Sequence, residues 1–292
     1  MANTLERISN EWDSEIVMPL REALVGRKLI PRNTKLSGKG IGMESVDYYT
    51  FGDLSAGLVD YSLPDNIGDQ DTVDLTTTTI KMAYLSKSFK IRRTSYEAYK
   101  LKNIPIDNSA AMTIADLVAM AENTVLIQGW KPDGTNYRIN GLYNAANNTE
   151  ATASDFGTYG NAMIKARLAM ALLLADNILP PYNLTLNPTQ YSELAGSIST
   201  TGASEWDQVI KLLNPNGGNT GQIFMSTDIT AATGMMTGIG NKYFDYIEGQ
   251  APKYQLTFDS KMGALSPVFG LLYEAVVPRI KQTNAICKLT GI

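Results

Sequence analysis

The chain has 292 residues, of which 44% are hydrophobic and 18% are charged, and its formal net charge is −4. This globular, mildly acidic composition argues against a protein that binds nucleic acid through net positive charge. With no histidine and one cysteine, Cys287, the chain lacks internal disulfides, the commonest general base and the usual zinc ligands.

No targeting signal stands out. The first residues, Met-Ala-Asn-Thr-Leu-Glu-Arg, carry no apolar signal core. The longest apolar stretch is interrupted by polar groups, which argues against a membrane span. We therefore expect synthesis in the cytoplasm and no membrane partner, and the single cysteine favours a reducing compartment.

The N-terminal residues 4–28 form a pattern that predicts an amphipathic helix, with Pro19 kinking or dividing it. Apolar residues recur there every three to four positions: Leu5, Ile8, Trp12, Ile16, Leu20 and Leu24. Whether this helix packs on its own domain or on a neighbouring subunit stays open. Residues 29–42 contain three glycines, but their spacing matches no phosphate-binding motif. We predict a flexible basic connector there.

Residues 43–80 combine β-branched and aromatic residues with turn residues, which predicts a long exposed hairpin. Its charge is one-sided, because residues 41–80 contain eight acids and no base, whereas residues 81–102 contain seven bases and one acid. A charge run is usually a solvated surface. Loops this long are uncommon unless they are functional, so we infer that the hairpin lies on another subunit with its acids against a basic surface. Residues 81–93 then form the returning strand.

Residues 107–130 predict the longest helix, with capping residues at its start and Gly129 at its end. A shorter helix is expected at 94–101. After the long helix, the pattern predicts helices at 160–177, 188–195 and 205–213 and strands at 184–186, 222–226, 243–247, 254–258 and 268–277. Residues 168–175 are apolar on all sides and should be buried. This half predicts an α/β sandwich with a mixed sheet.

Three groups of motifs follow one another along the chain. Trp12 with Ile16 precedes Leu24-Val-Gly-Arg-Lys28, the helix end 122–129 precedes Gly141-Leu142, and residues 176–187 read Asp-Asn-Ile-Leu-Pro-Pro-Tyr-Asn-Leu-Thr-Leu-Asn. This ordered set resembles the shell proteins of tailed phages and of encapsulin nanocompartments, whose fold is named for phage Hong Kong ninety-seven. The last motif is similar to the family's Asp-x-Ile-x-x-Pro-Tyr-x-Leu-x-apolar-Asn.

The resemblance implies an α+β fold of this phage-capsid type, with an N-terminal arm, an extended β-hairpin loop, a long spine helix and an α/β axial domain. The implied boundaries are 1–40 for the arm, 41–93 for the hairpin loop, 94–159 with 262–292 for a peripheral domain that carries the spine helix, and 160–261 for the axial domain.

The expected functional residues are contacts between subunits. The candidates are Trp12, Arg27, Lys28, Asp65, Asp69, Asp71, Lys87, Arg92 and Arg93. The resemblance also implies that loop 196–204 lines a pore at the capsomer centre, with Gly196, Ser199, Thr200 and Gly202 as candidates. We further expect the spine acids Asp116 and Glu122 to meet the lumen or a neighbour's basic arm. We expect no catalytic residue, cofactor or metal.

The leading hypothesis is a viral major capsid protein, assembled in the host cytoplasm from many copies of itself as pentamers, with hexamers left open. It would enclose double-stranded DNA without sequence-specific contact. The alternative is an encapsulin, a cytoplasmic nanocompartment around a cargo enzyme, and a third hypothesis is an α/β enzyme that uses carboxylates. Three departures from encapsulins favour the virus: no Gly-Pro-x-Gly-Trp follows Lys28, the hairpin is longer, and the stretch 279–292 extends further.

The acidic hairpin yields a direct prediction. Reversing Asp65, Asp69 and Asp71 to lysine should impair particle assembly without unfolding the subunit, because the introduced lysines would then face like charge on the basic neighbour surface. Electron microscopy counts the particles, and circular dichroism monitors the fold. Normal particles from this variant would mean that the acids are merely solvated.

Overall fold

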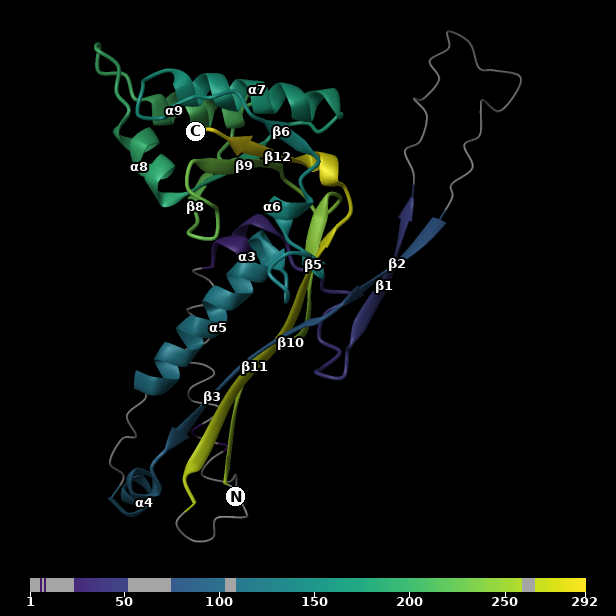
Figure 1. The fold of residues 1–292 in the computed structure, drawn as a ribbon, viewed down its shortest axis with the longest axis vertical. Helices are drawn as coiled ribbons and strands as arrows, with labels where there is room; N and C mark the ends of the chain where they lie inside the picture. The colour runs from purple at the N-terminus through teal and green to yellow at the C-terminus, as the bar shows by residue number, and fades with distance from the viewer. Residues whose placement is uncertain (1–5, 7, 9–23, 52–74, 103–108, 259–265) are drawn as a thin grey trace.

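The molecule is elongated and contains two main β-sheets, one of five strands and one of three. A long helix runs beside the three-stranded sheet, whose strands are the longest (Figure 1). The computed structural model describes residues 6, 8, 24–51, 75–102, 109–258 and 266–292, and all structural statements concern these residues. The described elements fit the predicted α+β class.

The first sheet, here the axial sheet, has five strands in the order β6-β12-β9-β7-β8. Strand β7 runs parallel to β8 and antiparallel to β9, so the sheet is mixed, as predicted. The strands span Asn148–Glu150 (β6), Tyr182–Leu186 (β7), Ile223–Met225 (β8), Thr233–Gly238 (β9) and Ile286–Thr290 (β12). The accompanying helices span Asn161–Ala175 (α7), Pro188–Gly196 (α8) and Glu205–Leu213 (α9), near the predicted positions. Strands β6, β9 and β12 were not predicted.

The second sheet, here the peripheral sheet, is antiparallel in the order β10-β11-β3. Its strands are Phe244–Phe258 (β10), Val268–Ile280 (β11) and Ala83–Ile91 (β3), and the helix Arg93–Lys102 (α4) follows β3. The strands predicted at 243–247 and 254–258 are confirmed as strand, but they are the two ends of one continuous strand, β10. The register shifts around Gln250 mark a bulge that keeps the strand continuous through Gly249 and Pro252.

The predicted spine helix is confirmed as α5, Ser109–Ile127, which packs along β3 and β11. It is long and apolar enough to cross a membrane by length and composition, but 50% of that window is buried inside the chain, as in a core helix. Its residues contribute to all three buried clusters: Leu126 to the axial cluster, Ile114 to the peripheral cluster and Val125 to the cluster at the hairpin root. Ile8 also lies in the peripheral cluster, so this N-terminal residue packs within its own chain.

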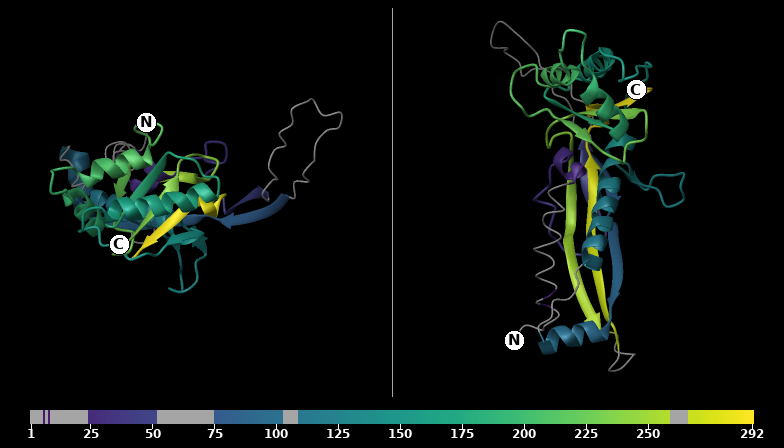
Figure 2. Two further views of the ribbon diagram at one scale, coloured as in Figure 1. Left: turned by 90° about the horizontal axis from the view of Figure 1, so that it is seen from above. Right: turned by 90° about the vertical axis from the view of Figure 1, so that its left-hand side faces the viewer.

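The predicted hairpin begins as a two-stranded ribbon that stands away from both sheets (Figure 2). Strand β1, Ser45–Phe51, pairs with β2, Leu75–Lys81, through seven residue pairs. The returning strand predicted at 81–93 is instead β3 of the peripheral sheet, because it pairs with β11.

The connector 29–42 was predicted to be flexible, but its backbone follows the edge of β10. The N–H groups of Asn33, Gly38 and Gly40 donate to carbonyls of that strand at 2.8–2.9 Å. The two glycines have φ values of +81° and +88°, which explains the glycine spacing without any phosphate. The prediction of flexibility was wrong because the open edge of β10 supplies acceptors that the sequence pattern does not reveal.

The sheets divide two chain segments differently from the predicted boundaries. Residues 286–290 were expected in the peripheral domain but pair with β9 in the axial sheet. Most of β10 was expected in the axial domain but pairs with β11 in the peripheral sheet. The physical reason is that a strand's sheet depends on which strand it pairs with, and periodicity does not report the pairing partner.

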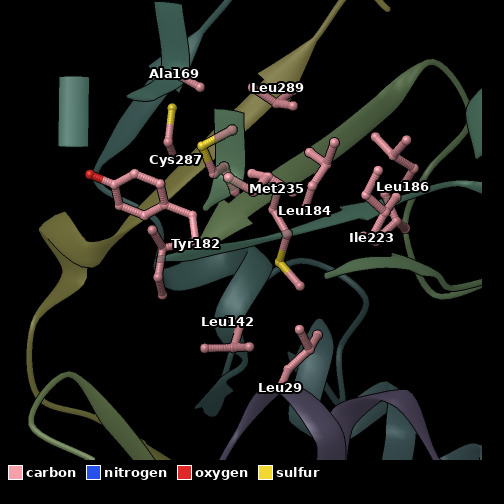
Figure 3. Close-up of a cluster of buried hydrophobic side chains, with 14 of the residues drawn as sticks. Leu29, Leu142, Ala169, Tyr182, Leu184, Leu186, Ile223, Met235, Cys287 and Leu289 are labelled. Atoms are coloured by element: carbon pink, nitrogen blue, oxygen red, sulfur yellow. The ribbon is translucent and has the colours of Figure 1, made fainter. Parts of the chain in front are cut away.

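The largest buried cluster joins the axial sheet to the other parts of the molecule (Figure 3). Leu29, from the short helix Val25–Leu29 (α3), and Leu142, from the helix Leu142–Ala145 (α6), approach the sheet residues from below in this view. Helix α7 is not buried all round as predicted, because Leu174 is 40% exposed. The remaining short elements are Gly129–Trp130 (β4), Ile139–Asn140 (β5) and Thr283–Ala285 (η3).

The turn after α5 yields a test of this packing. A Cβ on Gly129 would lie 2.2 Å from the Ile139 carbonyl oxygen, and its φ is +96°. Gly134 has a comparable φ of +72° but nothing within 4 Å of a Cβ. We expect Gly129→Ala to lower the free energy of unfolding by roughly 2–4 kcal/mol.

The matched control, Gly134→Ala, should lower it by only about 1 kcal/mol, because the strain is confined to the backbone. Thermal unfolding followed by tryptophan fluorescence compares the two variants. Equal midpoints would show that the β4–β5 turn moves aside at no additional cost.

Candidate assembly interface

A largely buried arginine fastens the N-terminal segment to both the spine helix and the peripheral sheet. Arg27 Nε lies 2.6 Å from Glu122 Oε1 on α5, and its Nη2 lies 2.9 Å from Glu274 Oε1 on β11. Its Nη1 lies 3.8 Å from Glu248 Oε2 on β10 and donates to Tyr246 Oη at 3.1 Å. The three carboxylates are at most 1% exposed, so one guanidinium joins three elements inside the protein.

The adjacent residue explains how α3 comes so close to the spine. Gly26 N–H donates to Asn123 Oδ1 at 2.8 Å, and a Cβ at this position would lie 3.0 Å from Leu126 Cβ. Gly26 therefore allows α3 to lie close to α5, and Arg27 supplies the positive charge that pairs with the buried carboxylates. These two roles explain the Gly-Arg part of the Gly-Arg-Lys motif.

Arg32 adds a second guanidinium, with its Nε 3.0 Å from Glu248 Oε2. We call Arg27, Arg32, Glu122, Glu248 and Glu274 the charge cluster. It brings together three acids and two bases, all within one chain. Burial disfavours the charged form of Arg27, but the Glu122 and Glu274 carboxylates outweigh this effect and raise the pKa of Arg27 above its ordinary value. The guanidinium therefore stays charged.

This geometry corrects one expectation and changes another. Glu122 was expected to meet the lumen or a neighbour's arm, but it is 1% exposed and pairs with Arg27 of its own chain. Arg27 was a candidate contact between subunits, and its side chain lies against its own α5, β10 and β11. Asp116 is exposed on the opposite face of α5. The two acids differ because helical position 122 faces the sheet and position 116 does not.

A second set of contacts ties the spine helix to the axial unit. Asp228, in the loop after β8, accepts hydrogen bonds from Asn123 Nδ2 and from Thr124 Oγ1. Gln128 Nε2 donates to the Asp228 carbonyl oxygen. Sequence analysis missed Asp228, since its partners lie about 100 residues away in the chain. The C-terminal half of α5 is therefore held from both sides.

The root of the hairpin is held by Asp245. Arg279 donates to its two oxygens at 2.8 and 2.6 Å, and Lys281 Nζ and Asn33 Nδ2 lie 2.8 and 2.9 Å from Oδ2. Burial raises the pKa of Asp245, but these hydrogen bonds outweigh burial and lower the pKa below its ordinary value. The Arg279 guanidinium also lies 5.3 Å from the ring centroid of Tyr48 on β1. The ribbon thus leaves the body from a fixed point.

The other interface candidates are dispersed. Lys28, Lys87 and Arg92 are exposed. Arg93 pairs with Glu97 at 2.6 Å and lies 4.5 Å from the ring centroid of Phe258. These candidates lie on α3, on β3 and at the start of α4. Four further candidates lie outside the described residues: Trp12, Asp65, Asp69 and Asp71.

Loop 196–204 is an ordered turn on the surface of the axial unit. Gly196 ends α8, and Ser199 N–H donates to the Ala203 carbonyl at 2.9 Å. Gly202, with φ of +84°, donates to the Ser199 carbonyl at 2.9 Å, and Thr200 is exposed at the tip. The four candidate residues lie together, as their sequence proximity requires.

The base of this loop is anchored by Glu205, the buried first residue of α9. Ser197 Oγ donates to one Glu205 oxygen at 2.7 Å, and the Met163 N–H donates to the other at 2.9 Å. The rings of Tyr191 and Trp206 pack edge to face at 5.1 Å beside it. The loop is therefore fixed relative to α7, α8 and α9.

Two titratable side chains in the axial unit, Cys287 and Lys165, are buried. Among the described residues, no group of three or more His, Cys, Asp or Glu side chains is arranged to hold a metal ion. Burial raises the pKa of the Cys287 thiol to about 12, so the thiol stays protonated at neutral pH and is a poor nucleophile. Lys165, with 0% exposure, donates to the Thr290 carbonyl at 2.8 Å and so fastens α7 to β12.

The comparisons with known proteins agree with this architecture. A family model described as "Encapsulating protein for peroxidase" matches residues 1–250. The type 1 encapsulin shell protein EncA of Myxococcus xanthus (strain DK1622) is 26% identical over 287 residues, which cover 96% of this chain and 92% of the relative. The diheme-cytochrome-encapsulin shell fusion protein of Kuenenia stuttgartiensis is 27% identical over 268 residues, which cover 91% of this chain and 68% of the relative.

Solved structures show the same fold. A virus-like particle from Pyrococcus furiosus matches with a TM-score of 0.66 and 17% identity, covering 96% of this chain and 98% of that one. The capsid of Myoviridae Phage XM1 matches with a TM-score of 0.62 and 12% identity, covering 91% and 90%. At these identities the likeness concerns the fold alone, and it confirms the predicted phage-capsid type.

The charge cluster yields a stability prediction. Arg27→Met should lower the free energy of unfolding by about 3–5 kcal/mol, because it leaves buried carboxylates without their central partner. Arg27→Lys should also destabilise, since an ammonium does not reproduce the fork geometry. The midpoint of thermal unfolding measures both effects.

The matched control is Arg167→Met on the exposed surface of α7, which should change the free energy of unfolding by roughly 0.5 kcal/mol or less. Equal midpoints for Arg27→Met and Arg167→Met would mean that the charge cluster contributes nothing to stability.

Proposed function

The chain belongs to the family described as encapsulating protein for peroxidase, and on this premise we propose that its shell is a compartment for a protein cargo. The chain itself is a self-assembling shell protein of a structural family. The proposal concerns the contents of the shell, which distinguish a nanocompartment from a virus.

The observation that carries the proposal is the exposed face of α5. Met112, Leu117 and Met120 are 47%, 47% and 64% exposed, and they lie on one side of the helix. Asp116 is the only charged residue exposed along α5. A surface that grips DNA needs cations, whereas methionine-rich apolar surfaces adapt to protein partners. We propose that this face looks into the lumen and meets cargo.

The second candidate is a capsid that encloses double-stranded DNA. The likeness in fold to the phage XM1 capsid favours it, as does a hairpin longer than encapsulins lead us to expect. The net charge of −4 is compatible with either content, because packaged DNA does not require a basic wall. The sequence match to a cargo-enclosing family supports the preference for a protein cargo that the exposed face of α5 carries.

Several features complete the proposal. The axial unit forms the centre of each pentameric or hexameric capsomer, and loop 196–204 lines its pore. Trp12, Lys28, Lys87, Arg92 and Arg93 contact neighbouring subunits, as do Asp65, Asp69 and Asp71. Assembly takes place in the cytoplasm.

The contents of native particles test the proposal. Particles purified from the source cells and treated with nuclease should contain a second protein in fixed proportion to the shell chain, together with little nucleic acid. Mass spectrometry identifies the protein, and extraction after particle disruption quantifies nucleic acid. Nuclease-resistant DNA of uniform length inside the particles would overturn the compartment and support the capsid.

A further inference from the structure

A groove lies at the root of the β1–β2 ribbon, and none of the interactions described so far uses it. Its volume is about 640 Å³, which is within the range of small-molecule sites in proteins. One side is formed by the ribbon, through Tyr48 of β1 and Lys81 of β2. The other side is formed by the β4–β5 turn and the end of β11, through Trp130, Arg138 and Pro278. The groove therefore lies between the ribbon and the rest of the molecule.

The groove is positively charged. Lys81 and Arg138 are the only charged residues that line it, and neither forms an ion pair within the described part of the chain. Both are exposed, so they are accessible from solution. The acids of the adjoining strand and turn are engaged elsewhere: Asp47 accepts from Thr79 Oγ1 at 2.5 Å, and Asp133 accepts from N–H groups of its own turn, which lower its pKa to about 2. An anion that enters the groove thus meets two cations and no carboxylate among the residues that line it.

An aromatic surface stands beside one of these cations. Trp130 is 49% exposed, and the Arg138 N–H donates to its carbonyl oxygen at 2.8 Å, so the turn holds the indole and the guanidinium on adjoining strands. Buried Ile139, which pairs with Trp130, and Pro278 add apolar surface. A planar ring stacks well on an exposed indole, because offset stacking of aromatic groups is favourable. The groove thus combines a stacking surface with two positive charges.

The two cations indicate the charge of a matching ligand. Two unit positive charges are balanced by a dianion, either a phosphate monoester, with about −1.5 to −2 charges at pH 7, or a pair of carboxylates. The guanidinium of Arg138 suits both groups, since its planar fork donates two parallel hydrogen bonds to carboxylate or phosphate oxygens. Neutral rings would leave both cations without a partner, and a small inorganic anion would leave the indole uncovered.

We propose that this groove binds a planar aromatic dianion, a ring that carries either a phosphate monoester or two carboxylates. The ring stacks on the indole of Trp130, and the anionic groups pair with Lys81 and Arg138. Asn140 and Thr283 also line the groove and supply further hydrogen-bond donors. The proposal concerns the shell chain itself and does not depend on the contents of the shell.

The position of the groove gives such a ligand a structural effect. Lys81 and Tyr48 belong to the ribbon, whereas Trp130 and Arg138 belong to the turn after the spine helix, so a ligand held by both sides bridges them. Two-stranded ribbons are marginal in water without a covering layer. Occupancy of the groove therefore steadies the ribbon at its root and slows hydrogen exchange of the paired amides of β1 and β2.

Binding to assembled particles of the full chain tests the assignment. The probes are naphthyl phosphate and naphthalene dicarboxylate, which present the two kinds of anionic group on the same ring. Naphthol supplies the ring without charge, and inorganic phosphate supplies charge without a ring. Titration calorimetry should show that at least one dianion binds about tenfold or more tightly than either control, because only the dianions use the indole and both cations. The relative affinity of the two dianions identifies the anionic group.

Substitutions locate the binding in this groove. Trp130→Ala, Arg138→Gln and Lys81→Gln should each weaken binding of the preferred dianion by about tenfold. The matched control is Lys131→Gln, since Lys131 is exposed in the same turn but lies over the Tyr137 ring and does not line the groove. It should leave the affinity unchanged. If Trp130→Ala forms no particles, the two glutamine variants still decide the result from opposite sides of the groove.

Hydrogen exchange measured by mass spectrometry supplies a second readout. The preferred dianion should slow exchange in β1 and β2 of wild-type particles and should have no such effect in Arg138→Gln particles. Three results would overturn the proposal: dianions that bind no better than naphthol or phosphate, binding that is lost equally in Lys131→Gln, and a bound dianion that leaves exchange in the ribbon unchanged. A groove already filled by another chain segment would give the first of these results.

Discussion

The fold depends on one guanidinium that is buried among three carboxylates from three different elements. Arg27 reaches Glu122 on α5, Glu248 on β10 and Glu274 on β11. Such groups are expensive to remove from water, and the arrangement is tolerable only when all partners are present together. The segment that carries Arg27 is consequently required for the stability of the peripheral sheet and the spine helix. Until it docks, the peripheral sheet and the spine helix share buried acids without their main counter-charge.

This constraint explains why the spine helix is polar at one buried position. Glu122 interrupts the apolar face of α5, yet α5 contributes to all three buried clusters. The two residues that follow Glu122, Asn123 and Thr124, donate hydrogen bonds to Asp228 of the axial unit. One helix thus fixes the N-terminal segment, the peripheral sheet and the axial sheet relative to one another. A subunit joined in this way presents its surfaces to neighbours at set angles, which a closed shell of identical units requires.

Sequence analysis predicted the parts whose signal is local and missed those whose partners are distant. The periodicity of α5, α8 and α9 and the alternation of β7 suffice to predict them. The sequence of strand β9, Thr-Gly-Met-Met-Thr-Gly, has the small residues of a turn. It forms a strand because it pairs with β7 on one side and with β12 on the other. Arg27 appeared to be part of an exposed basic stretch, because Glu248 and Glu274 lie more than 200 residues away. Glu122 stands among apolar residues in the sequence, and this was the one signal that its carboxylate is buried. Those neighbouring residues do not identify Arg27 as its partner.

Assembly uses the surfaces that the internal packing leaves exposed, and the β1–β2 ribbon is one of them. The β1–β2 ribbon is two-stranded, and such ribbons are marginal in water without a third strand or a covering layer. Asp245 holds Arg279 at the root of the ribbon, and this contact sets the direction in which the ribbon leaves the two main sheets. A two-stranded ribbon with a fixed direction is a surface that a neighbouring copy can cover. Repetition of one such contact around a closed symmetry is how identical chains build a shell.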